Sequence, residues 1–414
     1  MRIVHVYKDY YPPVRGGIEQ TVQRMAHEQV AAGDQVTVLC SAHGARRTTD
    51  ERVEGVRVVR VAEWGRALSA PFCPTMPLQL ARLEADVYHL HFPNPTGEVS
   101  WFLARRRGAL VVSYYSDIIR QAAVLPVYGR LIRGLLGRAD VILATSYRHV
   151  DLSPFLSRYR AKCRVVPLGI ELEPFLGIEA HRTHGAALRA SYGTPIVLFI
   201  GRFRYYKGLE VLLDAMPSVR GRAVLVGDGP MDERLREQHR RLGLGDRVVF
   251  AGALEQPALL DHVAAADVGV LPSTHPSEVY GLAQVEMMAS GLPVICTELH
   301  TGTSFVNLHG VTGLVVPPRD AVALAEALNR LLEDPELRRR LGAAARERAR
   351  ELFSARTMML GVRAAYEEAL EKRASAGAPP APPAGPARDA AAAHEGSEAK
   401  TAGRAARGAS GVAR

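Results

Sequence analysis

Short runs of Val, Ile and Leu alternate with amphipathic segments along most of the chain, and this alternation constrains the fold more than any other feature. In the first half the strand-like runs lie at 3–7, 35–40, 56–61, 86–90, 110–114 and 141–144. A second set lies at 196–200, 223–226, 248–250, 268–271, 294–296 and 314–316. Apolar strands that alternate with helices are typical of parallel sheets covered by helices on both faces. The sequence therefore predicts an α/β fold with two Rossmann-like, doubly wound domains, whose ligands bind at the carboxyl ends of the strands.

The domain boundaries follow from where this alternation stops. A chain of 414 residues is long enough for two separate cores. We expect an N-terminal domain over 1–170, a polar linker over 171–193 and a second domain over 194–352. A further helix is expected over 353–373, and the Ala-, Pro- and Gly-rich tail over 374–414 is predicted to be disordered.

Composition narrows the class of protein. The formal net charge is +9 and the sequence pI is about 9.5, which favours an anionic partner: a nucleotide sugar, an anionic lipid surface or a nucleic acid. Four scattered cysteines are typical of reduced thiols in a cytoplasmic protein, with no pair at metal-ligand spacing. No apolar run approaches the roughly 20 residues that span a bilayer.

The stretch after the strand-like run 268–271 carries the strongest chemical signal. Glu278 lies on the expected loop, and Glu286 lies about one turn into the helix that follows. The backbone N–H groups of Gly281, Leu282 and Ala283 would be unpaired at the start of that helix and could hold phosphate oxygens. A carboxylate beside them can accept two hydrogen bonds from the hydroxyls of a ribose. This arrangement predicts a nucleotide site.

Two other strand ends add to this site. Arg202 and Lys207 flank a loop after the run 196–200 and can converge on a pyrophosphate, Arg through a bidentate fork and Lys as a point charge. Gly16 and Gly17 follow the first strand and would let the backbone approach a ligand closely. A third loop, at 227–230, lacks the last glycine of a dinucleotide fingerprint, which argues against a hydride-transfer enzyme.

These motifs together resemble the retaining GT-B glycosyltransferases of family 4, the glycosyl transferases of group 1, over residues 1 to about 370. The resemblance implies that Glu278 contacts the donor sugar, that Glu286 binds the ribose, and that Arg202 and Lys207 hold the diphosphate. It also implies that the helix after residue 353 crosses back to the first domain. The loop at 298–307 resembles one in bacterial mannosyl- and rhamnosyltransferases, with His300 in place of a glycine, and this hints at a GDP-linked hexose donor.

The first half departs from the family pattern at one donor-site position. Tyr115 stands where many relatives have a histidine beside the donor sugar, two residues before Asp117. A phenol can exchange hydrogen bonds with a sugar but cannot shuttle protons near pH 7 as an imidazole does. His89 and His91 are expected at a strand end that lines the cleft, and without a third ligand nearby they do not suggest a metal site.

The resulting hypothesis is a retaining, metal-independent transferase of a hexose from a nucleotide sugar to a glycan or lipid-linked acceptor in surface-glycan synthesis. The donor is GDP-mannose-like or a UDP-sugar, no cofactor or metal is expected, and no Asp-x-Asp motif is present. Arginines at 105–107, 130, 133 and 138 are either solvated or contact an anionic membrane, which places the protein in the cytoplasm or on the inner face of the plasma membrane. The alternatives are a GT-B sugar-nucleotide epimerase or hydrolase, and an inactive nucleotide- or glycan-binding protein.

Overall fold

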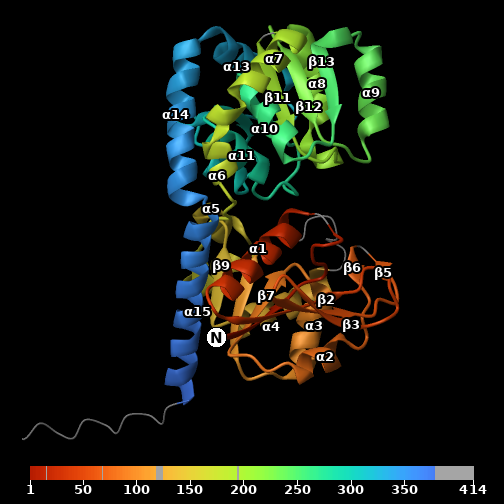
Figure 1. Ribbon diagram of the computed structural model, residues 1–414. Coiled ribbons are helices and arrows are strands. Elements are labelled where there is room, and N and C mark those ends of the chain that lie inside the picture. The colour runs from red at the N-terminus through yellow and green to blue at the C-terminus, as the bar shows by residue number, and fades with distance from the viewer. Residues whose placement is uncertain (15, 68, 118–124, 194, 378–414) are drawn as a thin grey trace, which may run out of the picture. The chain divides into compact units, whose positions relative to one another are not determined.

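The computed structural model describes residues 1–377 except Arg15, Leu68, residues 118–124 and Thr194. The predicted α/β architecture is confirmed, because the strands form two mainly parallel sheets (Figure 1). The tail predicted at 374–414 lies outside the described residues from 378 onward.

The first sheet has eight strands in the order β10-β9-β8-β7-β1-β2-β4-β3. Its strands are β1 (Arg2–Val6), β2 (Gln35–Ser41), β3 (Thr49–Val53), β4 (Val56–Val61), β7 (Val87–Phe92), β8 (Ala109–Tyr114), β9 (Val141–Ala144) and β10 (Cys163–Val165). All neighbours pair in parallel except β3, which is antiparallel to β4 at the edge. Strand β3 was not expected from the sequence, because its residues are mostly charged and exposed and do not form an apolar run. It also missed the small hairpin of β5 (Arg66–Ala67) and β6 (Ala70–Pro71).

The helices of the first half connect these strands. They are α1 (Gly17–Ala31), α2 (Met76–Arg82), α3 (Pro95–Ala104), α4 (Leu125–Arg138) and α5 (Tyr147–Leu152). Both faces of the sheet are buried, since Ile3 packs in one apolar cluster and its neighbour Val4 packs in another. Alternate residues of one strand point to opposite faces, so helices on both sides are needed to cover it.

The second sheet has six parallel strands in the order β13-β12-β11-β14-β15-β16. They are β11 (Ile196–Ile200), β12 (Arg222–Val226), β13 (Val248–Gly252), β14 (Val268–Leu271), β15 (Val294–Thr297) and β16 (Gly313–Val316). The order reverses between β11 and β14, and such a switch point is where open parallel sheets bind ligands. The strand-like runs of the sequence agree with these strands to within two residues.

The helices around this sheet include two that precede it and two that follow it. They are α6 (Glu173–Leu176), α7 (Arg182–Tyr192), α8 (Leu209–Ala215), α9 (Asp232–Arg241), α10 (Gln256–Ala265), α11 (Leu282–Ala289), α12 (Thr303–Val306), α13 (Ala321–Glu333) and α14 (Pro335–Leu352). Asp320 and Asp334 cap α13 and α14 by accepting a hydrogen bond from the third backbone N–H of each helix.

The last helix, α15 (Ala355–Gly377), packs against the first sheet rather than the second (Figure 1). The chain passes between the halves twice at one place, where Ile170 donates its N–H to Phe353 and accepts from Ala355. Along α15, Arg363 bonds Asp34 and Arg164 bonds Glu368. No described helix combines the length and the apolar composition that crossing a bilayer demands.

Candidate active site

A buried ion pair lies at the carboxyl end of the second sheet. The Lys207 Nζ atom lies 2.6 Å from the Glu278 Oε2 atom, and these residues are 9% and 6% exposed. Ser273 donates its hydroxyl to the same carboxylate oxygen at 3.0 Å. Desolvation opposes the charge on Lys207, but Glu278 and its neighbours more than compensate and raise the Lys207 pKa. The Lys207 ammonium therefore stays charged near neutral pH within this ion pair.

Tight loops bring these two residues together. Lys207 ends a single turn after β11, and Gly208 follows it with φ of 69°. Only glycine suits this position, because the backbone is left-handed and a Cβ atom would strike the carbonyl of Pro272. Glu278 is fixed on the β14–α11 loop, where its carbonyl accepts the Thr301 hydroxyl at 2.8 Å. The sequence thus placed Lys207 and Glu278 at one site, but it gave no signal for Ser273 as their partner.

Helix α11 begins where it was expected, directly after Gly281. Gly281 has φ of 74°, a left-handed conformation that suits glycine. The side chain of Gln284 donates to the carbonyls of Tyr280 and Thr303 and holds this first turn in place. Within the described part of the chain, the N–H groups of Gly281, Leu282 and Ala283 have no hydrogen-bond partner. Unpaired N–H groups at a helix start are suited to hold an anion.

Glu286 lies one turn further along α11. Desolvation raises its pKa to about 7, and Arg24 and Lys207 counteract part of this shift. A carboxyl with such a pKa changes charge near neutral pH. Arg24, on α1, comes from the first half of the chain and was not singled out from the sequence.

The other predicted diphosphate ligand, Arg202, is separate from the ion pair in this structure. Its guanidinium is 56% exposed and lies 3.9 Å from the Asp228 carboxylate. Such an exposed pair holds the side chain weakly, so Arg202 can turn toward a bound anion.

Two predicted residues of the first half lie at the glycine-rich loop before α1. Gly16 precedes α1 in an extended conformation, and a Cβ atom there would meet the Glu19 carboxylate. Gly17 begins the helix, and a Cβ atom would lie 3.8 Å from the Leu282 side chain. The loop before α1 and the start of α11 therefore adjoin each other.

Tyr115 and Asp117 are engaged by neighbouring protein groups. The Tyr115 hydroxyl lies 2.9 Å from the His91 Nδ1 atom, and the side chain is 2% exposed. Asp117 accepts hydrogen bonds from the hydroxyls of Tyr114 and Ser153, each at 2.7 Å. Contact of either residue with a donor sugar remains a prediction.

The expectation that His89 and His91 line a cleft is wrong. Both rings are completely buried in the first sheet, together with His5 from the adjacent strand β1. The ligand atoms of these three histidines lie within 4.8 Å of one another, so a third potential ligand does exist. It was missed because His5 is more than eighty residues away in the sequence.

A second cluster with metal-ligand geometry contains Asp9, His43 and Glu63. The Arg66 guanidinium already bonds Asp9 at 2.7 Å and Glu63 at 2.8 Å. The same guanidinium bonds all four oxygens of the two carboxylates, which are the oxygens that a metal ion would need.

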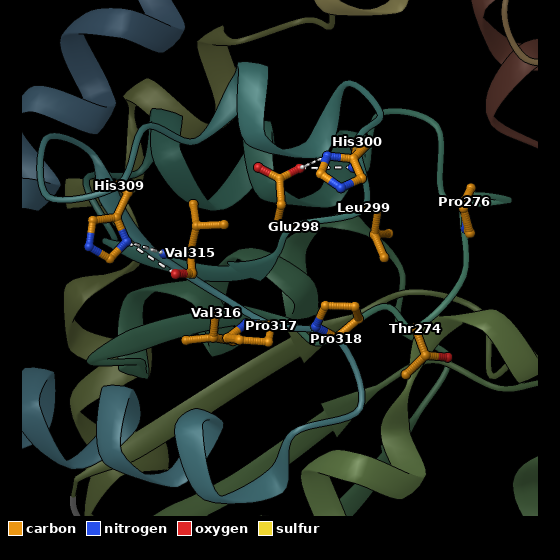
Figure 2. Close-up of a pocket in the computed structure, with 10 residues that line it drawn as sticks. All are labelled: Thr274, Pro276, Glu298, Leu299, His300, His309, Val315, Val316, Pro317 and Pro318. Carbon is orange, nitrogen blue, oxygen red and sulfur yellow. Dashed lines mark hydrogen bonds and ion pairs between the residues drawn. The ribbon is translucent and has the colours of Figure 1, made fainter. Parts of the chain in front are cut away.

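A cavity of about 680 Å³ lies at the ends of β14, β15 and β16 (Figure 2). Neither Lys207 nor Glu278 lines it. In Figure 2 the Glu298 carboxylate faces His300, and His309 bonds the backbone of Val315. His300 has φ of 57°, a left-handed conformation that favours glycine. This backbone conformation explains why similar sequences have a glycine at this position.

This fold and this site define a GT-B glycosyltransferase: two Rossmann-like halves, and a carboxylate, a cation and a helix N-terminus at the switch point of the second sheet. The model of the family "Glycosyl transferases group 1" matches residues 183–348, and that of the "Glycosyl transferase 4-like domain" matches residues 16–169. The chain belongs to the group 1 glycosyltransferases and is a hexosyltransferase.

Two curated relatives align over almost their whole length. The O-antigen chain mannosyltransferase C of Escherichia coli is 33% identical over 90% of this chain and 100% of its own. The D-rhamnosyltransferase WbpZ of Pseudomonas aeruginosa is 35% identical over 91% of this chain and 98% of its own. Among solved structures, the sucrose-phosphate synthase of Thermosynechococcus elongatus superposes with a TM-score of 0.75, at 26% identity over 90% of this chain and 99% of that one.

Proposed function

We propose that this enzyme transfers a hexose, with retention of anomeric configuration and without a metal ion, from a GDP-mannose-like donor to a glycan or lipid-linked acceptor. The observation that carries this proposal is the buried Lys207–Glu278 pair beside the unpaired N–H groups of α11. The names of the two curated relatives support surface-glycan synthesis and a mannose-related donor. We place the enzyme in the cytoplasm, on the inner face of the plasma membrane.

The proposed mechanism assigns a separate role to each part of the site. Lys207, Arg202 and the N–H groups of α11 stabilise the negative charge that develops on the departing nucleoside diphosphate. Glu286 accepts the ribose hydroxyls, and Glu278 accepts a hydroxyl of the donor sugar. The acceptor oxygen bonds to the anomeric carbon on the same face from which the phosphate oxygen leaves, so no protein nucleophile is needed. The leaving phosphate takes the proton of the acceptor hydroxyl.

A turnover assay with GDP- and UDP-sugars, a membrane lipid extract and excess chelator tests this proposal. We expect release of the nucleoside diphosphate that depends on the lipid extract, no loss of rate with chelator, and a product linkage with the donor's anomeric configuration by NMR. Arg202→Ala should abolish transfer while leaving the unfolding midpoint unchanged, because Arg202 is exposed. Nucleotide binding without release under any condition would instead indicate an inactive binding protein, and release without an acceptor would indicate a hydrolase.

A further inference from the structure

Seven buried polar side chains, six from the first half and one from the last helix, form a closed set of contacts. They come from β1, α1, β7, β8 with the residue after it, and α15. In order around the set they are Gln29, His5, His91, Tyr115, Ser113, His89 and Tyr366. None is more than 4% exposed. Polar groups buried this deeply are costly unless every one has a partner.

One arm of the set runs from helix α1 to the end of β8 through two histidines. The His5 Nε2 atom lies 2.7 Å from Gln29 Oε1, and its Nδ1 atom lies 2.9 Å from His91 Nε2. The other nitrogen of His91 lies 2.9 Å from the Tyr115 hydroxyl. The strand register explains the contact between His5 and His91. Strands β1 and β7 pair directly and place His5 beside His89, two residues before His91.

The other arm starts from the same glutamine and passes through α15. Gln29 Nε2 donates to the Tyr366 hydroxyl at 3.2 Å, and that hydroxyl lies 2.6 Å from His89 Nδ1. His89 Nε2 lies 2.7 Å from the Ser113 hydroxyl. Ser113 and Tyr115 lie two residues apart; burial raises the pKa of Tyr115 and a hydrogen bond with Ser113 opposes this rise, which joins the two arms. The seven side chains therefore close a ring.

The protons of this ring are interdependent. Each neutral imidazole has one donor and one acceptor nitrogen, and each hydroxyl can donate one proton and accept another. If His5 donates to Gln29, then His91 donates to His5, Tyr115 donates to His91, and the same direction continues through Ser113 and His89 to Tyr366. The reverse direction is the one other complete arrangement, with the amide of Gln29 turned over. The tautomers of all three histidines are thus set together.

A metal ion at the three histidines would break this ring. All six ring nitrogens already have a protein partner between 2.6 and 2.9 Å away. Burial also lowers the pKa of each histidine, to about 4 for His5, so the rings are neutral and no anion compensates a charge there. The cluster is a closed hydrogen-bond ring and not a metal centre.

We propose that Tyr366 is a positioning residue for sugar transfer, because it closes the ring that holds the end of β8 in place. Ser113 and Tyr115 are both ring members at this strand end, and Asp117 lies two residues after Tyr115. Tyr115 and Asp117 are the donor-sugar contacts assigned to this half, so the inference rests on the proposed function. Through the ring, a helix from the C-terminal end of the fold fixes a strand end that is more than two hundred residues away in the sequence.

The test compares Tyr366→Phe with Arg363→Gln in the full chain. Tyr366→Phe removes one oxygen and opens the ring. Arg363→Gln removes the 2.7 Å bond from the same helix to Asp34, outside the ring. We expect about a tenfold fall in kcat for Tyr366→Phe, with the Kd for nucleoside diphosphate unchanged. Arg363→Gln should lower the unfolding midpoint but leave kcat within about twofold.

Histidine side-chain ¹⁵N NMR tests the ring without any activity measurement. Opening the ring at Tyr366 should change the tautomer signals of His91 and His5 as well as His89, since the proton positions depend on one another. Ser113→Ala, which opens the ring at the opposite side, should do the same and replaces Tyr366→Phe if that variant does not fold. A change confined to His89, or an unchanged kcat in an active enzyme, would overturn the proposal. So would Zn²⁺ that raises the midpoint of the wild-type protein and shifts all three histidines.

Discussion

The buried polar side chains of the two sheets differ in charge and in what they bond. In the second sheet Lys207 and Glu278 form an ion pair, and the N–H groups at the adjoining helix start have no partner among the described residues. In the first sheet the histidines are neutral and bond only to other side chains of the ring. The same parallel architecture thus supports an open, charged site in one half and a closed, self-satisfied network in the other. Architecture alone therefore does not reveal which strand end binds a ligand; the pattern of unsatisfied groups does.

The largest effect should come from breaking the charged pair. Lys207→Met leaves the Glu278 carboxylate buried without its cation, which should destabilise the fold by about 3–5 kcal/mol. Transfer should fall by about 10²–10³-fold, because the leaving diphosphate loses its nearest positive charge. Urea unfolding and donor turnover measure the two effects separately.

A second substitution separates stability from activity at this pair. In the double variant Lys207→Met/Glu278→Gln no buried charge is left uncompensated, so most of the stability should return while turnover stays lost. A double variant that is as unstable as Lys207→Met would show that Glu278 is not the partner that Lys207 compensates.

The difference between the halves also explains what could be predicted from the sequence. The charged site is encoded in short segments, since Glu278, Gly281 and Glu286 lie within nine residues and Lys207 ends a recognisable loop. The ring is not, because Gln29 and Tyr366 are 337 residues apart and neither belongs to a motif. The Val-rich strands were visible by their composition, whereas β3 was hidden by its charged, exposed residues.

The first half contains a buried carboxyl that sharpens the comparison, because no cation of the described residues pairs with Glu98. It is 1% exposed and accepts hydrogen bonds from the Asn94 N–H at 2.8 Å and the Tyr128 hydroxyl at 2.6 Å. Burial raises its pKa to about 7. The pKa is higher in the folded than in the unfolded state, so the folded protein binds this proton more tightly. Its stabilising contribution is complete below the unfolded pKa of about 4.3 and is lost as the pH rises through 7.

Glu98→Gln should remove this pH dependence. At pH 8 we expect the variant to be more stable than the wild type by up to ~3 kcal/mol, and at pH 4 to be no more stable. Urea unfolding at both pH values measures the difference. An equal change at the two pH values would mean that Glu98 does not titrate in the folded protein.

The smallest effect concerns Glu286, whose raised pKa we expect to act on donor binding. Only the carboxylate form accepts two ribose hydroxyls, and this form is the minor one below the pKa of about 7. The affinity for a nucleotide-sugar donor should therefore rise about tenfold per pH unit up to 7 and level off near pH 8. A nucleotide sugar is the right probe, because its diphosphate is esterified at both ends and does not titrate in this range. Glu286→Gln should bind the donor more weakly and with no pH dependence between 5.5 and about 8.5. If the affinity of this variant for the donor still rises with pH, another group titrates, and Glu286 is not the residue that makes donor binding depend on pH.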